Sequence, residues 1–309
     1  MRILLTGGSG MLGQSLRAIA VREFPQHEII APTRSQLMLT NRDAVAEFMQ
    51  NGEFDAVIHG AARVGGIQAN IAHPVAFLAE NLQINDAVIM GAYKAKIERL
   101  FFLGSSCMYP KDYKQPLKEE YILQAPLEPT NEGYALSKIT GARLCEYIST
   151  QSGYAYKTLI PCNLFGENDH FGSDASHLIA AIVTKISEAV NDNKDTVEIW
   201  GSGNARREFL LVDDLARFIL QNIDKGHELP AYLNTGYGQD HSVFEYYQMI
   251  AELFSFKGTF TFDTSKPEGM MAKQMDSSIA AKHGWGPVTP INQALERIVQ
   301  KFQMQTQDQ

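Results

Sequence analysis

The sequence has few cysteines, only three among 309 residues. Cys107, Cys145 and Cys162 form no Cys-x-x-Cys pair and are odd in number, which argues against a disulfide framework or a structural zinc site and fits a reducing cytoplasm. Long apolar runs are also lacking, because no stretch approaches the roughly 20 apolar residues that span a bilayer. The apolar start, Met1–Leu5, leads straight into glycines and is too short for a signal peptide. We therefore expect a cytoplasmic protein without a membrane segment.

Excess positive charge is absent as well. The net charge of −8 argues against nucleic acid or an anionic membrane as the main partner. Any anionic ligand must then be held by local basic residues. With 45% hydrophobic and 20% charged residues, the composition is that of an ordinary globular protein. The length suits one large domain or two closely packed ones, and no internal repeat appears.

A glycine-rich turn near the N-terminus indicates a dinucleotide site. Residues 2–6 are typical of a buried parallel strand, the turn Gly7–Gly13 follows, and an amphipathic helix continues to about Glu23. Glycines let the backbone approach a pyrophosphate, and the helix N-terminus offers free N–H groups. An accidental glycine turn is the alternative, which the flanking strand and helix disfavour. The cofactor contacts expected here are Gly7, Gly10, Met11, Leu12 and Gly13.

The second expected strand, Glu28–Arg34, ends on a threonine and an arginine. An NAD-specific site usually has an acidic residue at this place, which bonds the ribose hydroxyls. A guanidinium group instead suits a 2′-phosphate, so Arg34 favours NADP(H). The alternative is an exposed arginine without a ligand.

Two further strands are expected at Phe54–Ala62 and Arg99–Tyr109. Between them the sequence predicts a loop over Val64–Asn70 and a helix over Val75–Lys96. The third strand ends in small residues, as a turn against a cofactor requires. His59 within it is expected to be a buried histidine with hydrogen-bond partners rather than a ligand.

The fourth strand has a polar end, Ser105-Ser106-Cys107. Ligands in open α/β sheets lie beyond the carboxyl ends of the strands, so these side chains are expected to face the cleft. A fifth strand is expected over Ala155–Ile160. The alternation of strands and helices predicts an α/β fold with a Rossmann-type doubly wound parallel sheet.

A tyrosine and a lysine open the helix that precedes this fifth strand and runs through Ile148. Their spacing puts Tyr134 and Lys138 on the same helical face. An ammonium group one turn away favours the phenolate, so we expect Lys138 to lower the pKa of the Tyr134 hydroxyl. Such a pair can protonate a carbonyl oxygen while a hydride reaches its carbon. The pentad alone is a weak signal, and a surface lysine beside a half-buried tyrosine is the alternative.

The glycine turn, the Ser-x-Cys at a strand end and the Tyr-x-x-x-Lys pentad together resemble the extended short-chain dehydrogenase/reductase family. Within it, further segments look like the GDP-L-fucose synthases, which are bifunctional GDP-4-keto-6-deoxymannose 3,5-epimerase/4-reductases. The resemblance runs in order from about residue 2 to about residue 300. Its most specific segments are Val64–Ile67, Gly104–Pro110, Leu127–Glu132, Trp200–Gly203 and Arg207–Asp214.

The resemblance implies two sets of catalytic residues. In the reductase set, Ser105 orients the 4-keto oxygen, Tyr134 donates a proton, and Lys138 adjusts the pKa of Tyr134. In the epimerase set, Cys107 and His177 move protons at C3 and C5. A 4-keto group acidifies both neighbouring carbons, so a base and an acid on opposite ring faces can invert each centre through an enolate. Alone, Cys107 would most often be a buried small hydrophobe and His177 a histidine on a helix surface.

The resemblance also implies the remaining binding residues. For the cofactor these are Ala61, Ala62, Pro161 and Asn163, beside the glycine turn, Arg34, Tyr134 and Lys138. For the sugar nucleotide they are Asn163, His177, Lys185, Trp200, Arg207 and Lys273. Asp213 and Asp214 are expected to cap a helix rather than to bind metal, and no metal site is predicted.

Two departures from the family pattern bear on the ligands. Ser9 stands where these synthases often have a basic residue, which weakens the indication for NADP(H). The segment Lys266–Lys273 lacks an arginine and a proline that would border the nucleotide sugar, which leaves the exact sugar open.

These expectations combine into one function. Residues 1–167 would form an NADP-binding Rossmann domain, and residues 168–309 would form most of a smaller, interleaved α/β domain for the sugar nucleotide. The chain would convert GDP-4-keto-6-deoxy-D-mannose to GDP-L-fucose with NADPH. It would act as a homodimer paired through the helices around Val75–Lys96 and Asn131–Ser152.

Several alternatives stay open from the sequence. The same chemistry could act on a related GDP-4-keto sugar, a 6-deoxy-heptose or a 3,6-dideoxyhexose, or the chain could be a plain 4-keto reductase. A 4,6-dehydratase would need an acid and a base beside the serine, which Cys107 and Met108 do not supply. From a different class, a regulator that senses NADP on a dead reductase fold is disfavoured by the retained Tyr134 and Lys138.

Overall fold

The computed structural model describes residues 1–172, 176–266, 269–286 and 289–307. Its main sheet has six parallel strands in the order β2-β1-β3-β4-β5-β9. The strands are β1 (Arg2–Thr6), β2 (Glu28–Ile30), β3 (Ala56–His59), β4 (Arg99–Leu103), β5 (Ala155–Pro161) and β9 (Tyr232–Thr235). The doubly wound parallel sheet expected from the sequence is confirmed.

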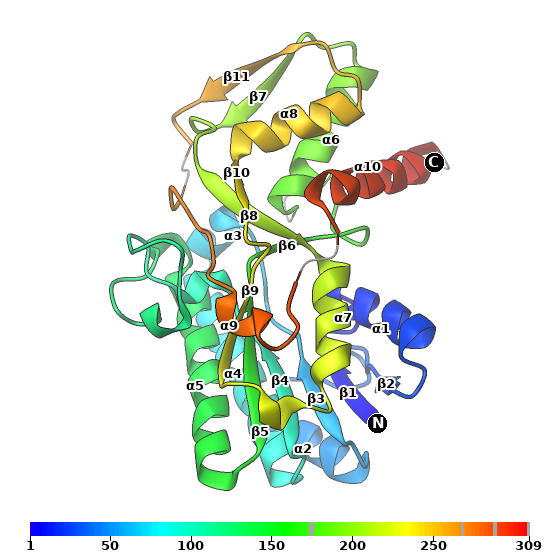
Figure 1. Ribbon diagram of the computed structural model, residues 1–309, viewed down its shortest axis with the longest axis vertical. Helices are drawn as coiled ribbons and strands as arrows, with labels where there is room; N and C mark the ends of the chain where they lie inside the picture. The colour runs from blue at the N-terminus through cyan, green and yellow to red at the C-terminus, as the bar shows by residue number, and fades with distance from the viewer. Residues whose placement is uncertain (173–175, 267–268, 287–288, 308–309) are drawn as a thin grey trace.

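Helices cover both faces of this sheet (Figure 1). On one face, α1 (Met11–Glu23) packs against α7 (Val212–Asn222). On the other face lie α2 (Arg42–Asn51), α4 (Pro74–Lys94) and α5 (Glu132–Ser152). A parallel sheet covered in this way has no solvated face, which is why its strands are nearly continuous apolar runs.

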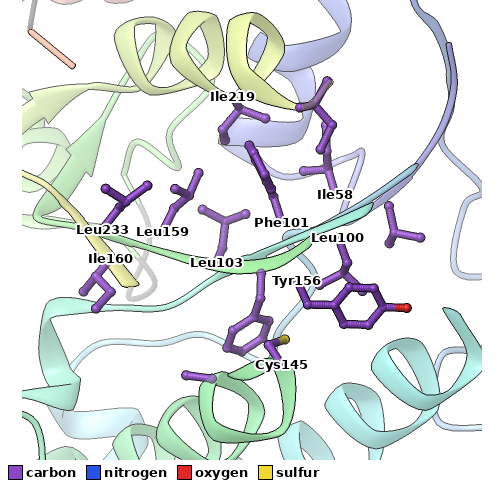
Figure 2. Close-up of a cluster of buried hydrophobic side chains, with 14 of the residues drawn as sticks. Ile58, Leu100, Phe101, Leu103, Cys145, Tyr156, Leu159, Ile160, Ile219 and Leu233 are labelled. Atoms are coloured by element: carbon purple, nitrogen blue, oxygen red, sulfur yellow. The ribbon is translucent and has the colours of Figure 1, made fainter. Parts of the chain in front are cut away.

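The core follows the alternation of side chains along each strand. Figure 2 shows Phe101 and Leu159 projecting from the sheet toward Ile219 of α7. Tyr156 projects to the opposite side, where Cys145 of α5 lies. All five side chains are almost completely buried. Burial of about 150–250 Å² by each aromatic ring makes this core a major source of stability.

A smaller α/β part occupies the upper half of Figure 1. In it, β8 (Arg206–Leu211) pairs antiparallel with β10 (Asp240–Ser242) and parallel with β6 (Asn163–Phe165). A second pair joins β7 (Thr196–Trp200) to β11 (Thr259–Asp263). The helices α6 (Leu178–Asn191), α8 (Val243–Leu253) and α10 (Ile291–Gln307) pack around these strands and enclose a second hydrophobic core.

The two parts are interleaved along the chain. α7 and β9 follow β8 in sequence, but α7 packs on the main sheet and β9 is one of its strands. The chain then returns to the smaller part at β10. The smaller interleaved C-terminal α/β part expected from the sequence is therefore observed. None of the helices in the described part of the chain has the length and apolar content that crossing a membrane requires.

Several short helices complete the fold. They are α3 (Ile67–Ala72), α9 (Ser278–Ala281) and the 3₁₀ turns Ser106–Met108, Glu119–Tyr121, Pro129–Asn131 and Gly226–Glu228. α8 begins with a capping box, in which Ser242 Oγ accepts from the N–H of Glu245 at 3.0 Å and the Glu245 carboxylate accepts from the N–H of Ser242 at 2.6 Å.

The structure corrects four expected elements. The second strand ends at Ile30 instead of Arg34, since Pro32 has no N–H to continue the ladder. The third strand covers only Ala56–His59. The fourth strand ends at Leu103 instead of Tyr109, and the 3₁₀ turn Ser106–Met108 follows it. The segment expected as a loop up to Asn70 contains the start of α3, which begins at Ile67.

The expectation for His59 is confirmed. It is fully buried and bonds Thr6 Oγ1 at 2.8 Å and Asn85 Oδ1 at 3.2 Å. Burial lowers the pKa of His59 to about 3, so it is a neutral structural histidine.

Candidate active site

A cavity of about 810 Å³ opens at the carboxyl ends of the main strands. Its walls come from the turns after β1, β3, β4 and β5, from α5 and from the start of α6. The strand order reverses between β1 and β3, and this switch point is where open α/β sheets bind ligands. All predicted cofactor residues line the cavity: Gly7, Gly10, Met11, Leu12, Gly13, Arg34, Ala61, Ala62, Tyr134, Lys138, Pro161 and Asn163.

The glycine turn is shaped for a backbone that approaches a ligand closely. Gly7 has φ +78°, and a Cβ there would lie 2.8 Å from the Ala61 nitrogen. A Cβ on Gly13 would overlap the Gly7 carbonyl oxygen. α1 starts after Gly10 without a side-chain cap, so its first N–H groups stay available to an anion. These features fit the pyrophosphate of a dinucleotide cofactor.

Arg34 lies at one end of the cavity, with its side chain 79% exposed. Its Nη2 is 3.7 Å from Glu80 Oε1, and Arg63 Nη1 is 2.9 Å from Glu80 Oε2. One carboxylate thus stands between two guanidinium groups, which leaves a net positive charge. This end of the cavity therefore fits a ligand phosphate.

Ser105, Tyr134 and Lys138 come together at the end of β4. The Ser105 hydroxyl bonds that of Tyr134 and accepts from the N–H of Cys107 at 3.2 Å. Lys138 Nζ donates to the Leu103 carbonyl at 2.7 Å and stands 5.8 Å from the Tyr134 ring centre. Burial lowers the pKa of Lys138 to about 8, against a smaller opposing effect of Cys107.

The expectation that Lys138 lowers the pKa of Tyr134 is wrong for this structure. Burial raises the pKa of the Tyr134 hydroxyl, the neighbouring Cys107 raises it further, and only the bond to Ser105 lowers it. The ammonium group of Lys138 is held by the Leu103 carbonyl rather than by the phenol oxygen. Tyr134 is consequently a protonated phenol at neutral pH, which is the form that a proton donor needs.

Two donors converge on the sulfur of Cys107. Asn131 Nδ2 lies 3.2 Å from Sγ, and Lys273 Nζ lies 3.6 Å from it. Lys273 is only 9% exposed, so its charge is poorly screened by solvent. The pair gives Cys107 a hydrogen bond and a neighbouring positive charge, which is the environment of reactive rather than structural cysteines.

His177 stands at the same cavity, immediately before α6. Its Nδ1 is 2.8 Å from Asp169 Oδ1, and this bond raises the pKa of His177 against the opposing effect of burial. His177 thus faces the cavity with a raised tendency to carry a proton.

The structure places only some of the predicted sugar-nucleotide residues at the cavity. Asn163, His177 and Arg207 line the cavity, and Arg207 Nη1 donates to the Met270 carbonyl at 2.5 Å. Lys185 and Trp200, both in the described part of the chain, do not line it. Instead, the Lys185 ammonium lies 4.9 Å from the Trp200 ring centre, on the smaller α/β part.

The 266–273 segment also gives Trp200 a second cation. Lys266 Nζ lies 5.3 Å from the Trp200 ring centre. Pro267 and Glu268 of the same predicted segment lie outside the described residues.

The expectation that Asp213 and Asp214 cap a helix is wrong in detail. The N-cap of α7 is Leu211, which makes no side-chain cap, and both aspartates lie in the first turn. Asp213 accepts from Ser15 Oγ at 2.5 Å and from Arg297 Nη2 at 2.7 Å. Within the described residues, no group of three or more histidine, cysteine or acidic side chains is placed to hold a metal ion.

Sequence reasoning missed Asn131, Asp169 and Glu80 as neighbours of the site. Asn131 lay inside one of the specific segments, so the sequence did carry a signal for it. Asp169 and Glu80 have no such signal, because each contacts its partner only once the chain has folded.

A glycine turn at the switch point of a parallel sheet, with serine, tyrosine and lysine around one cavity, defines a nicotinamide-dependent reductase or epimerase of the short-chain type. The sequence profile of the NAD dependent epimerase/dehydratase family matches residues 3–235. The chain belongs to this family.

Individual relatives are similar over nearly the whole chain. A GDP-L-colitose synthase from Yersinia pseudotuberculosis is 43% identical over 303 residues, which cover 98% of each chain. A GDP-L-fucose synthase from Azorhizobium caulinodans is 44% identical over 286 residues, 93% of this chain and 91% of the relative. Among solved structures, a GDP-L-fucose synthetase from Naegleria fowleri bound to NADP matches with a TM-score of 0.88 and 26% identity, over 99% of this chain and 93% of the other.

Proposed function

We propose that this protein is a bifunctional 3,5-epimerase and NADPH-dependent 4-reductase that converts GDP-4-keto-6-deoxy-D-mannose to GDP-L-fucose. The observation that carries the proposal is that Ser105, Cys107, Tyr134, Lys138 and His177 line one cavity together with the glycine turn. A single bound sugar can then meet both sets of catalytic groups.

For reduction, NADP(H) supplies the hydride that reaches C4. The glycine turn and the first N–H groups of α1 would hold its pyrophosphate, and Ala61, Ala62, Pro161 and Asn163 would line its path. Ser105 would orient the 4-keto oxygen, and the Tyr134 phenol would give it a proton. Lys138 would supply positive charge beneath the Tyr134 ring, which offsets the phenolate that this proton transfer leaves behind.

For epimerisation, Cys107 would remove a proton from the carbon beside the ketone. Lys273 and Asn131 would stabilise the negative charge on its sulfur. His177 would return a proton to the other face of the resulting enolate, which inverts the centre. Neither step consumes a hydride, so epimerisation can precede reduction.

The remaining residues would hold the sugar nucleotide. Arg207 lies at the cavity, and Lys185 with Trp200 offers a cationic and aromatic surface farther out on the smaller α/β part. We accordingly propose that residues 1–167 bind mainly the cofactor and that residues 168–309 bind mainly the GDP-sugar. The three free cysteines support a cytoplasmic location, since Cys107 must stay reduced to act as a base.

A second candidate substrate is a GDP-4-keto-3,6-dideoxyhexose. The similarity to a GDP-L-colitose synthase supports it, and so does the 266–273 segment, where Met270 and Ala272 stand in place of a more polar threonine and arginine of the family pattern. Met270 is buried, and its carbonyl accepts from Arg207 at the cavity. A 3,6-dideoxy sugar has no stereocentre at C3, so only C5 would be inverted.

Product analysis separates these functions. The enzyme is incubated with NADPH and either GDP-4-keto-6-deoxy-D-mannose or its 3-deoxy analogue, and the product is identified by NMR. GDP-L-fucose from the first substrate at the higher kcat/KM supports the proposal. A faster reaction of the 3-deoxy analogue supports the second candidate, and a reduced but unepimerised sugar from both contradicts the epimerase function.

Cofactor preference should depend on Arg34. Arg34→Ala removes a cation from the phosphate end of the cavity, and a charged hydrogen bond contributes about 1.5–3 kcal/mol. We expect the ratio of kcat/KM for NADPH to that for NADH to fall by roughly 10- to 100-fold. Arg42→Ala is the matched control, because Arg42 pairs with Asp86 on the surface and does not line the cavity. An unchanged ratio in Arg34→Ala would show that another residue reads the phosphate.

We also propose a homodimer in which α4 and α5 pair with their symmetry mates. These helices pack against each other and expose Val75, Leu136 and Tyr147, an apolar set that a partner could bury. Light scattering at micromolar concentration should give twice the chain mass of 34.4 kDa. Leu136→Glu should shift the mass toward the monomer, and a monomeric wild type would contradict the proposal.

A further inference from the structure

His177 and Asp169 form a hydrogen-bonded pair at the edge of the cavity. The distance from His177 Nδ1 to Asp169 Oδ1 is 2.8 Å. An ionised carboxylate can only accept, so Nδ1 carries the proton of this bond. The other ring nitrogen, Nε2, is then the one left for a ligand in the cavity that His177 lines.

The Asp169 side chain is buried, while that of His177 is partly exposed. The Asp169 side chain is 3% exposed, against 48% for His177. The backbone N–H of Asp169 donates to the Gly166 carbonyl at 3.1 Å, and its Oδ1 also accepts from the N–H of His170 at 2.8 Å. Asp169 is therefore an anchored carboxylate that can orient the more exposed His177 ring.

The charge of Asp169 is incompletely compensated. Its second oxygen, Oδ2, is buried and receives no hydrogen bond from the described residues. A buried carboxylate with an open acceptor site is stabilised by a nearby positive charge, and an imidazolium at Nδ1 supplies one. This bond to Asp169 is the main cause that raises the pKa of His177.

Other charged and titratable groups share the cavity with His177. Cys107, Tyr134, Lys138 and Arg207 line it, and Lys273 stands behind the Cys107 sulfur. These three cations would oppose a protonated His177, so its raised pKa depends on Asp169 rather than on its surroundings as a whole.

We propose that Asp169 is a positioning residue for epimerisation, which keeps His177 protonated and presents its Nε2–H to the enolate. The inference rests on the proposed epimerase function and extends it by one residue. In the step, the Nε2–H bond breaks, a C–H bond forms on the enolate carbon, and a neutral imidazole remains bonded to Asp169 through Nδ1–H. Water then returns a proton to His177 and takes one from Cys107, so the protons balance.

Asp169→Asn tests this role, since it preserves the size of the side chain and removes its charge. Two quantities are measured: deuterium incorporation at C3 and C5 of the keto sugar in deuterated water, and the protonation and tautomer of His177 by NMR of the nitrogen-15-labelled protein. We expect exchange to slow by about tenfold or more at the carbon that His177 protonates. The pKa of His177 should fall, and NADPH oxidation should persist.

A double-mutant comparison shows whether Asp169 acts through His177. Adding Asp169→Asn to His177→Gln should cause no further loss of exchange beyond His177→Gln alone. Asp192→Asn is the matched control, because Asp192 forms an exposed ion pair with Lys194 at the far end of α6. It should leave exchange and His177 unchanged. If Asp169→Asn does not fold, Asp169→Ser keeps an acceptor for the N–H of His170 and serves in its place.

These experiments distinguish a failure of the inference on Asp169 from a failure of the proposed epimerase function. A wild type that exchanges neither proton contradicts the epimerase function, while the NMR titration still decides whether Asp169 controls His177. A wild-type pKa and tautomer of His177 in Asp169→Asn would overturn the inference. An equal further loss in the His177→Gln background would also overturn it, because Asp169 would then act through some other group.

Discussion

Tyr134→Phe should lower kcat for reduction of the 4-keto sugar by roughly 100- to 10,000-fold, the range found for the loss of a general acid. Tyr134 lines the cavity, and burial raises the pKa of its hydroxyl, so the phenol carries the proton that the ketone oxygen needs. The ring itself remains, and Lys138 keeps its bond to the Leu103 carbonyl. NADPH affinity should therefore stay within a few-fold of the wild type. The measurement is single-turnover NADPH oxidation beside a binding titration.

The control for this variant removes a hydroxyl elsewhere. Tyr121 lies in the short 3₁₀ turn Glu119–Tyr121, where it packs on Tyr113 outside the cavity. Tyr121→Phe should leave kcat unchanged. Near-normal reduction by Tyr134→Phe would refute its assignment as the proton donor.

Cys107→Ser should slow exchange of the C3 and C5 protons by roughly 100-fold or more, because a hydroxyl is a far weaker base than a thiolate. Lys273 and Asn131 would still point at residue 107, but an alcohol there does not ionise at neutral pH. Ser105, Tyr134 and Lys138 are untouched, so the variant should still oxidise NADPH. Its product should be an unepimerised GDP-6-deoxy sugar, identified by NMR.

Cys145→Ala is the matched control for the thiol. Cys145 is buried on α5 against the main sheet (Figure 2), and burial raises its pKa, so it cannot act as a base. Cys145→Ala should exchange both protons like the wild type. If Cys107→Ser also does so, Cys107 is structural and the protein is a plain 4-keto reductase.

The fold was predictable from the sequence because its signals are local. The apolar run before Gly7, the glycine turn and the amphipathic helix to Glu23 follow one another without interruption, and each appears as expected. The pentad that carries Tyr134 likewise lies at the start of a helix, α5, as expected. Strand ends were less predictable, as the end of β3 at His59 shows, because the length of a pairing depends on a neighbouring strand distant in sequence.

The electrostatics of the site were not predictable from spacing. Helical periodicity places Lys138 beside Tyr134 but does not reveal that the Leu103 carbonyl captures its ammonium group. Nor does it reveal how deeply the phenol is buried, which decides the direction of its pKa shift. Lys273 shows the same limit, since the sequence suggested a sugar-nucleotide contact and the fold brings it to Cys107. Such contacts join segments that only the folded chain brings together.

The central claim is that one cavity performs both epimerisation and reduction. Its most direct test is to incubate the wild-type enzyme with GDP-4-keto-6-deoxy-D-mannose in deuterated water, first without NADPH and then with it, and to follow both carbons by NMR. We predict that deuterium enters C3 and C5 before any reduction, and that NADPH then yields GDP-L-fucose labelled at both positions. NADPH consumption without deuterium at either carbon would contradict the claim.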